Sequence, residues 1–458
     1  MPMLAHRAAV EVVRTLRSRG YQAYLVGGCV RDLLLGRDPA DFDVSTDATP
    51  DQVMRVFPQT YAVGAQFGVV LVPFKSVGLD GAPAAGEELT AEHPKVIEVA
   101  TFRSDGVYSD GRHPDAVRYT TDPREDVQRR DFTINGLMLD PLNGHRVLDY
   151  VDGQLDLQRH LIRTIGDPER RFREDKLRMM RAVRFAARFE YEIDPDTFAA
   201  IRRLAPEIRQ VSRERQREEL TKMLTEGKAR RAFELLDASG LLHEVLPEVE
   251  KMKGVEQPPQ FHPEGDVWIH TLLLLSMMAA GTSRTLAWGA LLHDVGKPPT
   301  FRVAPDRIRF DDHVEVGTRM AEEIGQRFRM SNDDIAQISA LVANHLRFAD
   351  VKNMKESTFK RFIRLPKFDE HLELHRIDCL GSHGILDLYH YTREKIADLP
   401  PEQVRPQPLI TGNDLLAAGY RQGPRFKEIL SAVEDAQLDG RLHSPTEAMS
   451  FVEQQFPK

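Results

Sequence analysis

Cysteine is scarce in this sequence, because its 458 residues include only Cys29 and Cys379. Two cysteines this far apart form neither a disulfide framework nor a zinc knuckle. Apolar runs are short as well, and none approaches the roughly 20 residues that span a bilayer. Residues 1–20 are predicted to form an amphipathic helix, without the apolar centre of a secretory signal. These absences exclude a disulfide-rich secreted protein and predict a cytoplasmic protein with no membrane contact.

Internal repeats and low-complexity tracts are also lacking, which excludes a solenoid and a disordered chain. Hydrophobic residues make up 41% and charged residues 29% of the sequence, an ordinary globular composition. The length is too great for one core, so two to four domains are expected. The oligomeric state cannot be predicted from these features.

The net charge of −8 is unevenly distributed along the chain. Residues 159–231 contain 20 Lys and Arg against 13 Asp and Glu, a charge of +7 that leaves −15 for the rest. A basic segment in an acidic protein is a candidate phosphate-binding surface. A solvated helix face with mixed charges explains the same count equally well.

Secondary-structure signals change along the chain at two Pro-rich linkers. The first 150 residues mix strand and helix patterns, with Gly78–Pro94 as a surface loop, and the pattern is helical from Pro168 to about Leu246. Linkers are predicted at Gly254–Pro263 and from Leu399 to Pro408, on either side of a second helical region. The resulting prediction is four parts, with the boundaries 1–150, 151–253, 254–398 and 399–458.

A glycine turn followed by paired carboxylates is the most informative feature. Gly27 and Gly28 lie between a predicted strand and a predicted helix, where glycine lets the backbone approach an anion closely. Arg31 lies in the first helical turn and can bind phosphate. Asp41 and Asp43 are two residues apart at the start of a predicted strand, Phe42–Ser45, so both carboxylates face one way and suit Mg²⁺. Either motif alone is more often a plain turn, but their order and spacing make the pair specific.

The segment from Leu25 to Thr46, LVGGCVRDLLLGRDPADFDVST, resembles the signature of DNA polymerase β-type nucleotidyltransferases. More narrowly, it is similar to the bacterial class II tRNA nucleotidyltransferase and poly(A) polymerase family. The resemblance implies that Asp41 and Asp43 bind the catalytic metals and that the glycine turn with Arg31 holds the incoming triphosphate. A third carboxylate on a neighbouring strand is also implied, with Glu98 as the candidate and Asp110 as the alternative.

Two further blocks follow in the order of that family. ATFRSDGVYSDGRHPDAV (Ala100–Val117) resembles the segment that holds Arg103, Asp105 and a flexible loop. RRDFTINGL (Arg129–Leu137) resembles the block that contacts sugar and triphosphate, and the resemblance assigns those contacts to Arg130, Asp131 and Asn135. Standing alone, this block would be interpreted as a basic helix start with a buried Asn.

A basic helix is predicted over the whole of Arg171–Glu190. Asp175 precedes Arg178 by three residues, so their side chains would be neighbours and could read the edge of a base. An ordinary helical ion pair is the simpler interpretation. The resemblance favours the first, since Glu174, Asp175 and Arg178 match the family's amino-acid template for choosing CTP or ATP, and Arg181 and Arg184 match further nucleotide-contacting arginines. SRERQREEL (Ser212–Leu220) resembles the block that supports these helices.

A second set of metal-ligand residues lies in the second helical region. His270, the dipeptide His293-Asp294 and Asp378 are natural ligands for a divalent metal, which can activate water for phosphoester hydrolysis. With Gly296-Lys297 after the dipeptide, the pattern resembles the HD phosphohydrolase superfamily. His313 and His345 fall where some members bind a second metal. His262 is interpreted as a linker histidine rather than a ligand.

Together these resemblances imply an α+β multidomain fold. A nucleotidyltransferase head with a mixed sheet and helices would be followed by an all-α neck that binds RNA and nucleotide, an HD domain and a helical tail. The implied activity is the addition of CMP and AMP to the 3′ end of tRNA from CTP and ATP, with Mg²⁺ in the head and a divalent metal of unknown identity in the HD domain. A poly(A) polymerase or a CC-only or A-only enzyme is the alternative, and an HD phosphohydrolase with a nucleotide-sensing head is a reading from a different class.

Overall fold

The computed structural model describes residues 2–61, 68–77, 96–106, 117–260, 262–263, 265–305 and 307–458, with only the backbone at Pro2, Ser76 and Asp105. The chain divides into two compact units. The first comprises Met1–Met223 and Arg231–Leu246, and the second Leu224–Arg230 and Pro247–Lys458. The four-part division remains a prediction. Within the described ranges, no helix combines the length and the apolar character needed to cross a membrane.

The first unit begins with a mixed sheet, whose six strands among the described residues lie in the order β3-β4-β2-β1-β7-β8. These strands are β1 (Ala23–Val26), β2 (Asp43–Thr46), β3 (Val69–Pro73), β4 (Val96–Thr101), β7 (Leu137–Asp140) and β8 (Arg146–Asp149). β2 and β4 run parallel, and the other neighbours run antiparallel. A separate hairpin pairs β5 (Arg103–Asp105) with β6 (Val117–Tyr119).

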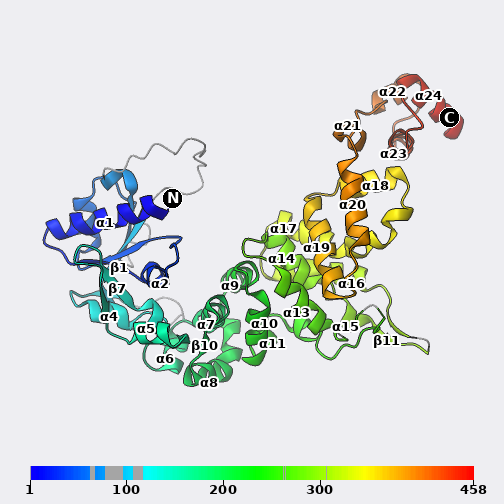
Figure 1. The fold of residues 1–458 in the computed structure, drawn as a ribbon. Helices are drawn as coiled ribbons and strands as arrows, with labels where there is room; N and C mark the ends of the chain where they lie inside the picture. The colour runs from blue at the N-terminus through cyan, green and yellow to red at the C-terminus, as the bar shows by residue number, and fades with distance from the viewer. Residues whose placement is uncertain are drawn as a thin grey trace. The chain divides into compact units, whose positions relative to one another are not determined.

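Helices cover this sheet because apolar residues recur along them at helical spacing. In α1 (Pro2–Ser18) the side chains of Ala9, Val12, Val13 and Leu16 are fully buried, and the helix packs on β1, β2 and β4 (Figure 1). The other helical segments of this part are α2 (Gly28–Leu34), α3 (Pro50–Val56), η2 (Phe74–Val77), α4 (Pro123–Gln128) and η3 (Thr133–Asn135).

The rest of the first unit is mainly helical. Its elements are α5 (Gly153–Gln158), β9 (Leu161–Ile162), α6 (Pro168–Glu174), α7 (Leu177–Phe189), β10 (Glu192–Ile193), α8 (Pro195–Leu204), η4 (Ala205–Gln210), α9 (Arg213–Thr225), α10 (Ala229–Ala238) and α11 (Leu241–Val245). The short parallel pair β9–β10 is the one departure, among the described residues, from the all-α neck expected here.

The prediction of one continuous helix over Arg171–Glu190 is wrong. α6 ends at Glu174, and Asp175 has an extended backbone before α7 begins at Leu177. The Asp175 carboxylate accepts a hydrogen bond of 3.1 Å from the backbone N–H of Leu177. Aspartate competes with the helix in this way, which is why it is favoured at helix starts and disfavoured inside helices.

The second unit is helical except for one described hairpin, β11 (Phe301–Val303) and β12 (Ile308–Phe310). Its helical segments up to the second linker are α12 (Pro247–Glu250), α13 (Val267–Met277), α14 (Arg284–Leu292), α15 (Lys297–Thr300), α16 (His313–Arg327), α17 (Asn332–Asn344), η5 (His345–Asn353), α18 (Glu356–Ile363), α19 (Phe368–Gly381) and α20 (Asp387–Ala397).

The C-terminal tail has its own small core. Its segments are α21 (Pro401–Val404), α22 (Gly412–Ala417), α23 (Arg425–Leu438) and α24 (Pro445–Gln455). Leu415, Ile429, Val433 and Val452 form the centre of that core. The predicted fold class, a mixed sheet with helices followed by helical domains, is thus confirmed.

Candidate active sites

Three carboxylates lie at β2 and β4, two neighbouring inner strands of the first unit's sheet. Asp43 begins β2 and pairs in register with Glu98 on β4, so the two side chains leave the sheet on the same face. Asp41 lies just before the strand and is exposed. Burial raises the pKa of Asp43 to about 7, and the charges of Glu98 and Asp41 contribute, against the lowering effect of Arg130. Desolvation and the Asp41 charge likewise raise the pKa of Glu98.

Mutual repulsion of this kind is what a bound divalent cation relieves, and hard carboxylate oxygens are the donors that Mg²⁺ prefers. These residues therefore fit a metal. Among the described residues, the groups of three ligand atoms lying within 4.8 Å of one another are both in the second unit, so the head carboxylates are more widely spaced. Of the two third-carboxylate candidates, Glu98 lies beside Asp43, whereas Asp110 is outside the described residues.

The glycine turn lies beside two guanidinium groups. Gly27 has a φ of 75° and ψ of −133° and precedes α2. A methyl group at Gly27 would lie 3.2 Å from Nη1 of Arg130, and one at Gly28 would lie 3.5 Å from Nη2 of Arg31. Arg130 also donates to Ser45, which shares the strand face of Asp43. The turn thus presents positive charge next to the carboxylates, an arrangement suited to a triphosphate with its metal.

Replacing Gly27 with Ala should therefore weaken triphosphate binding. The new methyl group would lie 3.2 Å from Nη1 of Arg130, so the guanidinium must shift. Alanine must also adopt backbone angles that only glycine adopts readily, which costs about 1–3 kcal/mol. We expect the dissociation constant of CTP, measured by calorimetry, to rise about tenfold or more. Gly36→Ala is the matched control, because φ is 66° there and nothing lies within 4 Å. Equal affinities of the two variants would contradict this prediction.

The other residues predicted to contact the triphosphate form hydrogen bonds with protein side chains. Arg31 is buried, with Nη1 donating to Asn135 at 2.6 Å and Nε donating to Asp32 at 2.8 Å. Asp131 is also buried and accepts two bonds from Arg181, at 3.0 and 2.6 Å, and one from Asn135 at 3.1 Å. Although burial raises the pKa of Asp131, Arg181 and Asn135 lower it to about 2. The structure thus joins Arg31, Asn135, Asp131 and Arg181 in one network.

Asp175 and Arg178 lie at the break between α6 and α7, each with a different partner. Both oxygens of Asp175 accept from Arg215 on α9, at 3.2 and 2.8 Å. Arg178 donates to Glu174 at 3.0 Å and to the backbone oxygen of Arg129 at 3.0 Å. The expected helical contact between Asp175 and Arg178 is therefore replaced by two separate anchors.

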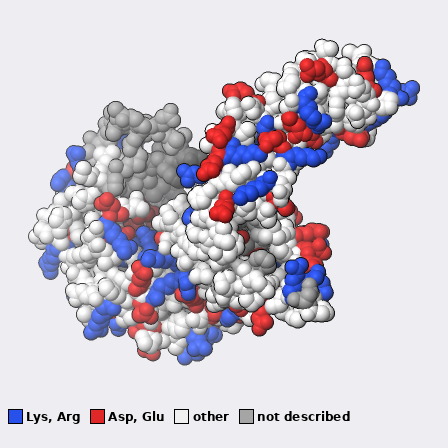
Figure 2. Space-filling view, turned by 45° about the vertical axis from the view of Figure 1, so that its right-hand side comes forward, with Lys and Arg blue, Asp and Glu red and all other residues white. Residues whose placement is uncertain are grey.

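Much of the basic charge of residues 159–231 is paired. Arg184 forms a buried pair with Glu219 at 2.6 Å. Arg163 pairs with Asp156, just before this segment, and pairs within it join Arg170 to Glu174, Arg173 to Glu169, Arg203 to Glu169 and Arg231 to Glu192. Figure 2 shows basic and acidic side chains interspersed over the described surface of the face drawn. The charge count alone therefore does not define a bare phosphate-binding surface.

The second unit brings the predicted HD residues together. Nε2 of His270 lies 3.1 Å from Asp378 and 3.3 Å from Nε2 of His293, and His293 lies 3.2 Å from Oδ2 of Asp294. Oδ1 of Asp294 faces two further rings, His345 at 3.8 Å and His313 at 4.0 Å. Asp294 therefore belongs to two ligand clusters, one with His270 and His293 and one with His313 and His345.

The ring orientations of these histidines fit metal ligands. Nδ1 lies near a backbone oxygen in His293 (2.8 Å from Ala290), His313 (2.9 Å from Phe310) and His345 (2.7 Å from Val342). Because a carbonyl oxygen only accepts, Nδ1 carries a proton, and in a neutral ring Nε2 then keeps a free electron pair. Nε2 of His313, Nε2 of His345 and Oδ1 of Asp294 are buried without a hydrogen-bond partner among the described residues. Such atoms are suited to a cation.

The protonation states also fit. Burial lowers the pKa of His345 to about 4 and that of His313 below its usual value, so both rings are neutral at pH 7. Burial opposes ionisation of Asp294, but His293 and Lys297 hold its pKa well below the usual range. Neutral His313 and His345 beside an ionised Asp294 are the forms that bind a metal. His262, predicted to be a linker residue, lies with its ring centre 4.9 Å from that of His270.

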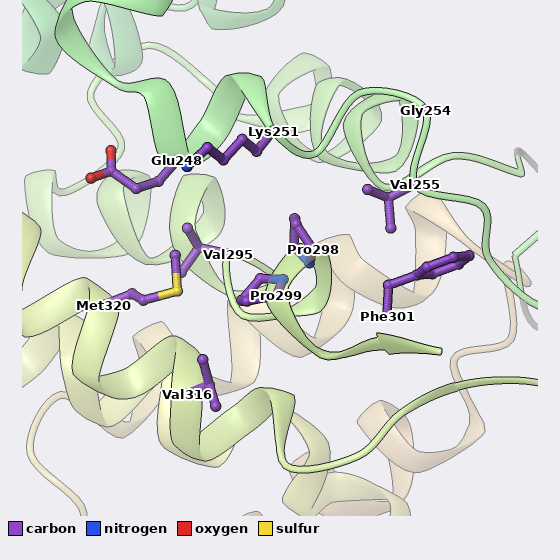
Figure 3. Close-up of a pocket in the computed structure, with 10 residues that line it drawn as sticks. All are labelled: Glu248, Lys251, Gly254, Val255, Val295, Pro298, Pro299, Phe301, Val316 and Met320. Atoms are coloured by element: carbon purple, nitrogen blue, oxygen red, sulfur yellow. The ribbon is translucent and has the colours of Figure 1, made fainter. Parts of the chain in front are cut away.

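An apolar pocket of about 520 Å³ lies elsewhere in the second unit (Figure 3). Val295, Pro298, Phe301 and Met320 are among its lining residues, and it is lined by none of the HD residues described above. Val295 and Pro298 directly follow Asp294 and Lys297 in the chain, but the metal-ligand side chains themselves are not among the lining residues.

Three family models match successive parts of the chain. They are described as the poly A polymerase head domain (residues 23–163), the probable RNA and SrmB-binding site of polymerase A (190–253) and the HD domain (267–379). The nucleotidyltransferase and HD families are metal-dependent.

Curated relatives of the chain are named CCA-adding enzyme. That of Geobacillus stearothermophilus is 41% identical over 51% of this chain and 53% of its own, and that of Bacillus licheniformis is 36% identical over 61% and 66%. The chain thus spans between about half and two thirds of these first relatives. The Levilactobacillus brevis protein is 29% identical over 96% of both chains.

Solved structures share the fold. The CCA-adding enzyme of Bacillus stearothermophilus in complex with CTP matches with a TM-score of 0.72 and 26% identity, over 98% of this chain and 97% of that chain. The Thermotoga maritima CCA-adding enzyme complexed with tRNA matches with a TM-score of 0.58 and 17% identity, over 98% of this chain and 94% of that chain. At this identity the similarity shows a shared fold alone.

Proposed function

We propose that this chain, which belongs to the bacterial class II tRNA nucleotidyltransferase and poly(A) polymerase family, adds CMP and AMP to the 3′ end of tRNA from CTP and ATP. The observation that carries the proposal is the carboxylate cluster of Asp41, Asp43 and Glu98 beside the glycine turn and Arg130. The names of the relatives support the substrates, tRNA, CTP and ATP. We also expect a cytoplasmic location, because tRNA is processed there.

In this proposal Asp41 and Asp43 hold Mg²⁺, with Glu98 as a third carboxylate beside them. When bound, the metal would lower the pKa of the tRNA 3′-hydroxyl and neutralise charge on the triphosphate. The turn at Gly27 and Gly28, with Arg130, would orient the triphosphate so that pyrophosphate leaves opposite the attacking oxygen. Arg31, Asn135, Asp131 and Arg181 would keep that turn and α7 in place, so that catalysis rests on positioning and charge neutralisation.

Asp175 and Arg178 are proposed to select the base. Each is anchored by a separate partner, Arg215 and Glu174, so the carboxylate and the guanidinium are held in fixed orientations. A fixed acceptor and donor can pair with the edges of cytosine and adenine. Arg184, in its buried pair with Glu219, would hold α7 against α9.

Replacing Asp175 or Arg178 with Ala should broaden nucleotide choice. We expect the preference for CTP over UTP to fall at least about tenfold, because one lost base contact is worth about 1–3 kcal/mol. A competition among four labelled nucleotides on one tRNA measures it. Arg173→Ala is the control, since Arg173 is exposed and pairs with Glu169 on the same helix. Unchanged nucleotide selectivity in both Asp175→Ala and Arg178→Ala would refute the assignment.

The alternatives within the class are a poly(A) polymerase and an enzyme adding only C or only A. The length of the loop after Arg103 bears on this choice, but its residues 107–116 lie outside the described part of the chain. The relatives' names favour CCA addition. Purified protein should transfer label from α-labelled CTP and ATP to tRNA that lacks its CCA end, and chelation of divalent metal should stop the transfer. Absence of label on tRNA at saturating Mg²⁺ would contradict the proposal.

A second, hydrolytic function is proposed for the HD cluster. Its two ligand groups share Asp294, and their histidine nitrogens are oriented for metal. His270, His293, Asp294 and Asp378 would hold one divalent metal, and His313 and His345 would join Asp294 at another. Such a centre supplies an activated water for phosphoester hydrolysis. An HD phosphohydrolase with a nucleotide-sensing head would use this site alone, and the carboxylate cluster of the head disfavours that reading.

A further inference from the structure

Lys297 is a buried cation at the HD cluster. Its ammonium lies 2.8 Å from Oδ2 of Asp294, and only 6% of the residue is exposed. It also lies 5.4 Å from the centre of the Phe310 ring. A buried positive charge next to a metal ligand competes with the metal for that ligand unless a second group fixes its position.

Gln257 is that second group. Its Oε1 accepts a hydrogen bond of 2.6 Å from Nζ of Lys297, and only 2% of the residue is exposed. Because an ammonium only donates, this contact also fixes which end of the amide faces Lys297. A chain of contacts therefore runs from Gln257 through Lys297 to Asp294.

Gln257 comes from a segment outside the matched HD domain, which begins at residue 267. Backbone contacts close this segment at its base, with the N–H of Gln257 donating to Gly265 at 2.8 Å and that of Val267 donating to Val255 at 3.0 Å. A bridge between Glu256 and Asp266 lies between them. These contacts fix the backbone at Gln257, whose side chain reaches Lys297 at the cluster.

We propose that Gln257 is a positioning residue of the HD metal centre: it holds the Lys297 ammonium on Oδ2 of Asp294 and so leaves Oδ1 for the metal shared with His313 and His345. The inference rests on the proposed metal-binding role of that cluster. Oδ1 of Asp294 is the buried oxygen without a hydrogen-bond partner among the described residues. Without Gln257, the Lys297 ammonium would donate hydrogen bonds to both oxygens of Asp294, and Oδ1 would no longer be left for the metal.

Metal binding by the full-length protein tests this inference. Asp41→Asn/Asp43→Asn serves as the background, so that Mn²⁺ titrated by calorimetry reports on the HD cluster. In that background Gln257→Leu should lower Mn²⁺ affinity about ten- to a hundredfold, the usual effect of losing a residue that orients a metal ligand. Gln257→Glu, which keeps the acceptor oxygen, should stay within about threefold. Gln257→Asn shortens the side chain, so its oxygen no longer reaches Lys297, while the residue stays a polar amide. It must lower Mn²⁺ affinity as Gln257→Leu does.

Gln337→Leu is the matched control, because Gln337 is also buried in the second unit and donates to Glu370 at 3.1 Å. It should leave Mn²⁺ affinity unchanged. Lys297→Met supplies the decisive comparison: if Gln257 acts through Lys297, Gln257→Leu adds less than about twofold in the Lys297→Met background. An undiminished loss there, or unchanged or tighter binding by Gln257→Leu alone, overturns the inference. A background protein that binds no Mn²⁺ would overturn the metal proposal along with it.

Discussion

Asp43→Asn is expected to abolish nucleotide addition while making the metal-free protein more stable. Asp43 lies on β2 opposite Glu98, with Asp41 close enough to raise its pKa. The amide keeps the shape of the side chain but removes the charge that would hold Mg²⁺. Losing about 4 kcal/mol of transition-state stabilisation by the metal would lower the rate about a thousandfold. Single-turnover incorporation of CMP into tRNA measures this loss.

The stability change distinguishes a lost metal ligand from a damaged fold. The pKa of Asp43 is about 7 in the folded protein, above its ordinary value of 3.8. The folded state therefore binds more protons than the unfolded state, so stability falls as pH rises from about 4 to about 7. Asp43→Asn removes this penalty, and the melting temperature at pH 8 without metal should rise by a few degrees.

Asp51→Asn is the control, because Asp51 is an exposed carboxylate on α3 in the same unit. It should change neither incorporation nor the melting temperature. Incorporation by Asp43→Asn at the wild-type rate would remove the carboxylate pair from the mechanism. A lower melting temperature would show instead that the charge supports the fold.

Asp294→Asn is expected to remove metal-dependent phosphoester hydrolysis and to leave nucleotide addition intact. Asp294 is the carboxylate that both HD clusters share, with Oδ2 near His293 and Oδ1 near His313 and His345. Asparagine retains an oxygen for Lys297 but not the charge, so metal affinity should fall about tenfold to a hundredfold. Hydrolysis of p-nitrophenyl phosphate with Mn²⁺, Ni²⁺ or Co²⁺, and CMP incorporation by the same preparation, are the two measurements.

Asp369→Asn serves as the control in the same unit, since Asp369 lies in the first turn of α19, nine residues before Asp378. It should leave both activities unchanged. Equal losses of hydrolysis and incorporation in Asp294→Asn would show that the two sites do not work separately. Unchanged hydrolysis would place that activity outside the HD cluster.

Local sequence patterns were enough to nominate most residues of the two proposed sites. The glycine turn, the spacing of Asp41 and Asp43 and the dipeptide His293-Asp294 are short-range signals. β1 and α2 flank the glycine turn as expected, and β2 begins one residue after the start of the predicted strand Phe42–Ser45. The helix over Arg171–Glu190 was predicted wrongly because the apolar spacing continues through Asp175, while the capping contact of Asp175 to Leu177 ends α6.

Several partners that are distant in sequence could not be predicted. Arg215 lies 40 residues from Asp175, Arg181 lies 50 from Asp131, and Lys297 lies 40 from Gln257. No periodicity relates such residues, since their contacts depend on how separate helices pack. The charge count of residues 159–231 therefore could not decide between a phosphate-binding surface and a face of mixed charges, whereas the fold pairs many of these arginines internally.

The most direct test of the central claim is the length of the product made on a tRNA end. Three forms of one tRNA, ending before the first C, after one C and after two, are incubated with Mg²⁺ and with each nucleotide or all four, and the products are resolved to single nucleotides. The account predicts extension by C, C and A, one step for each missing residue, and a stop after the A. No extension, or a long run of A on every form, would contradict it.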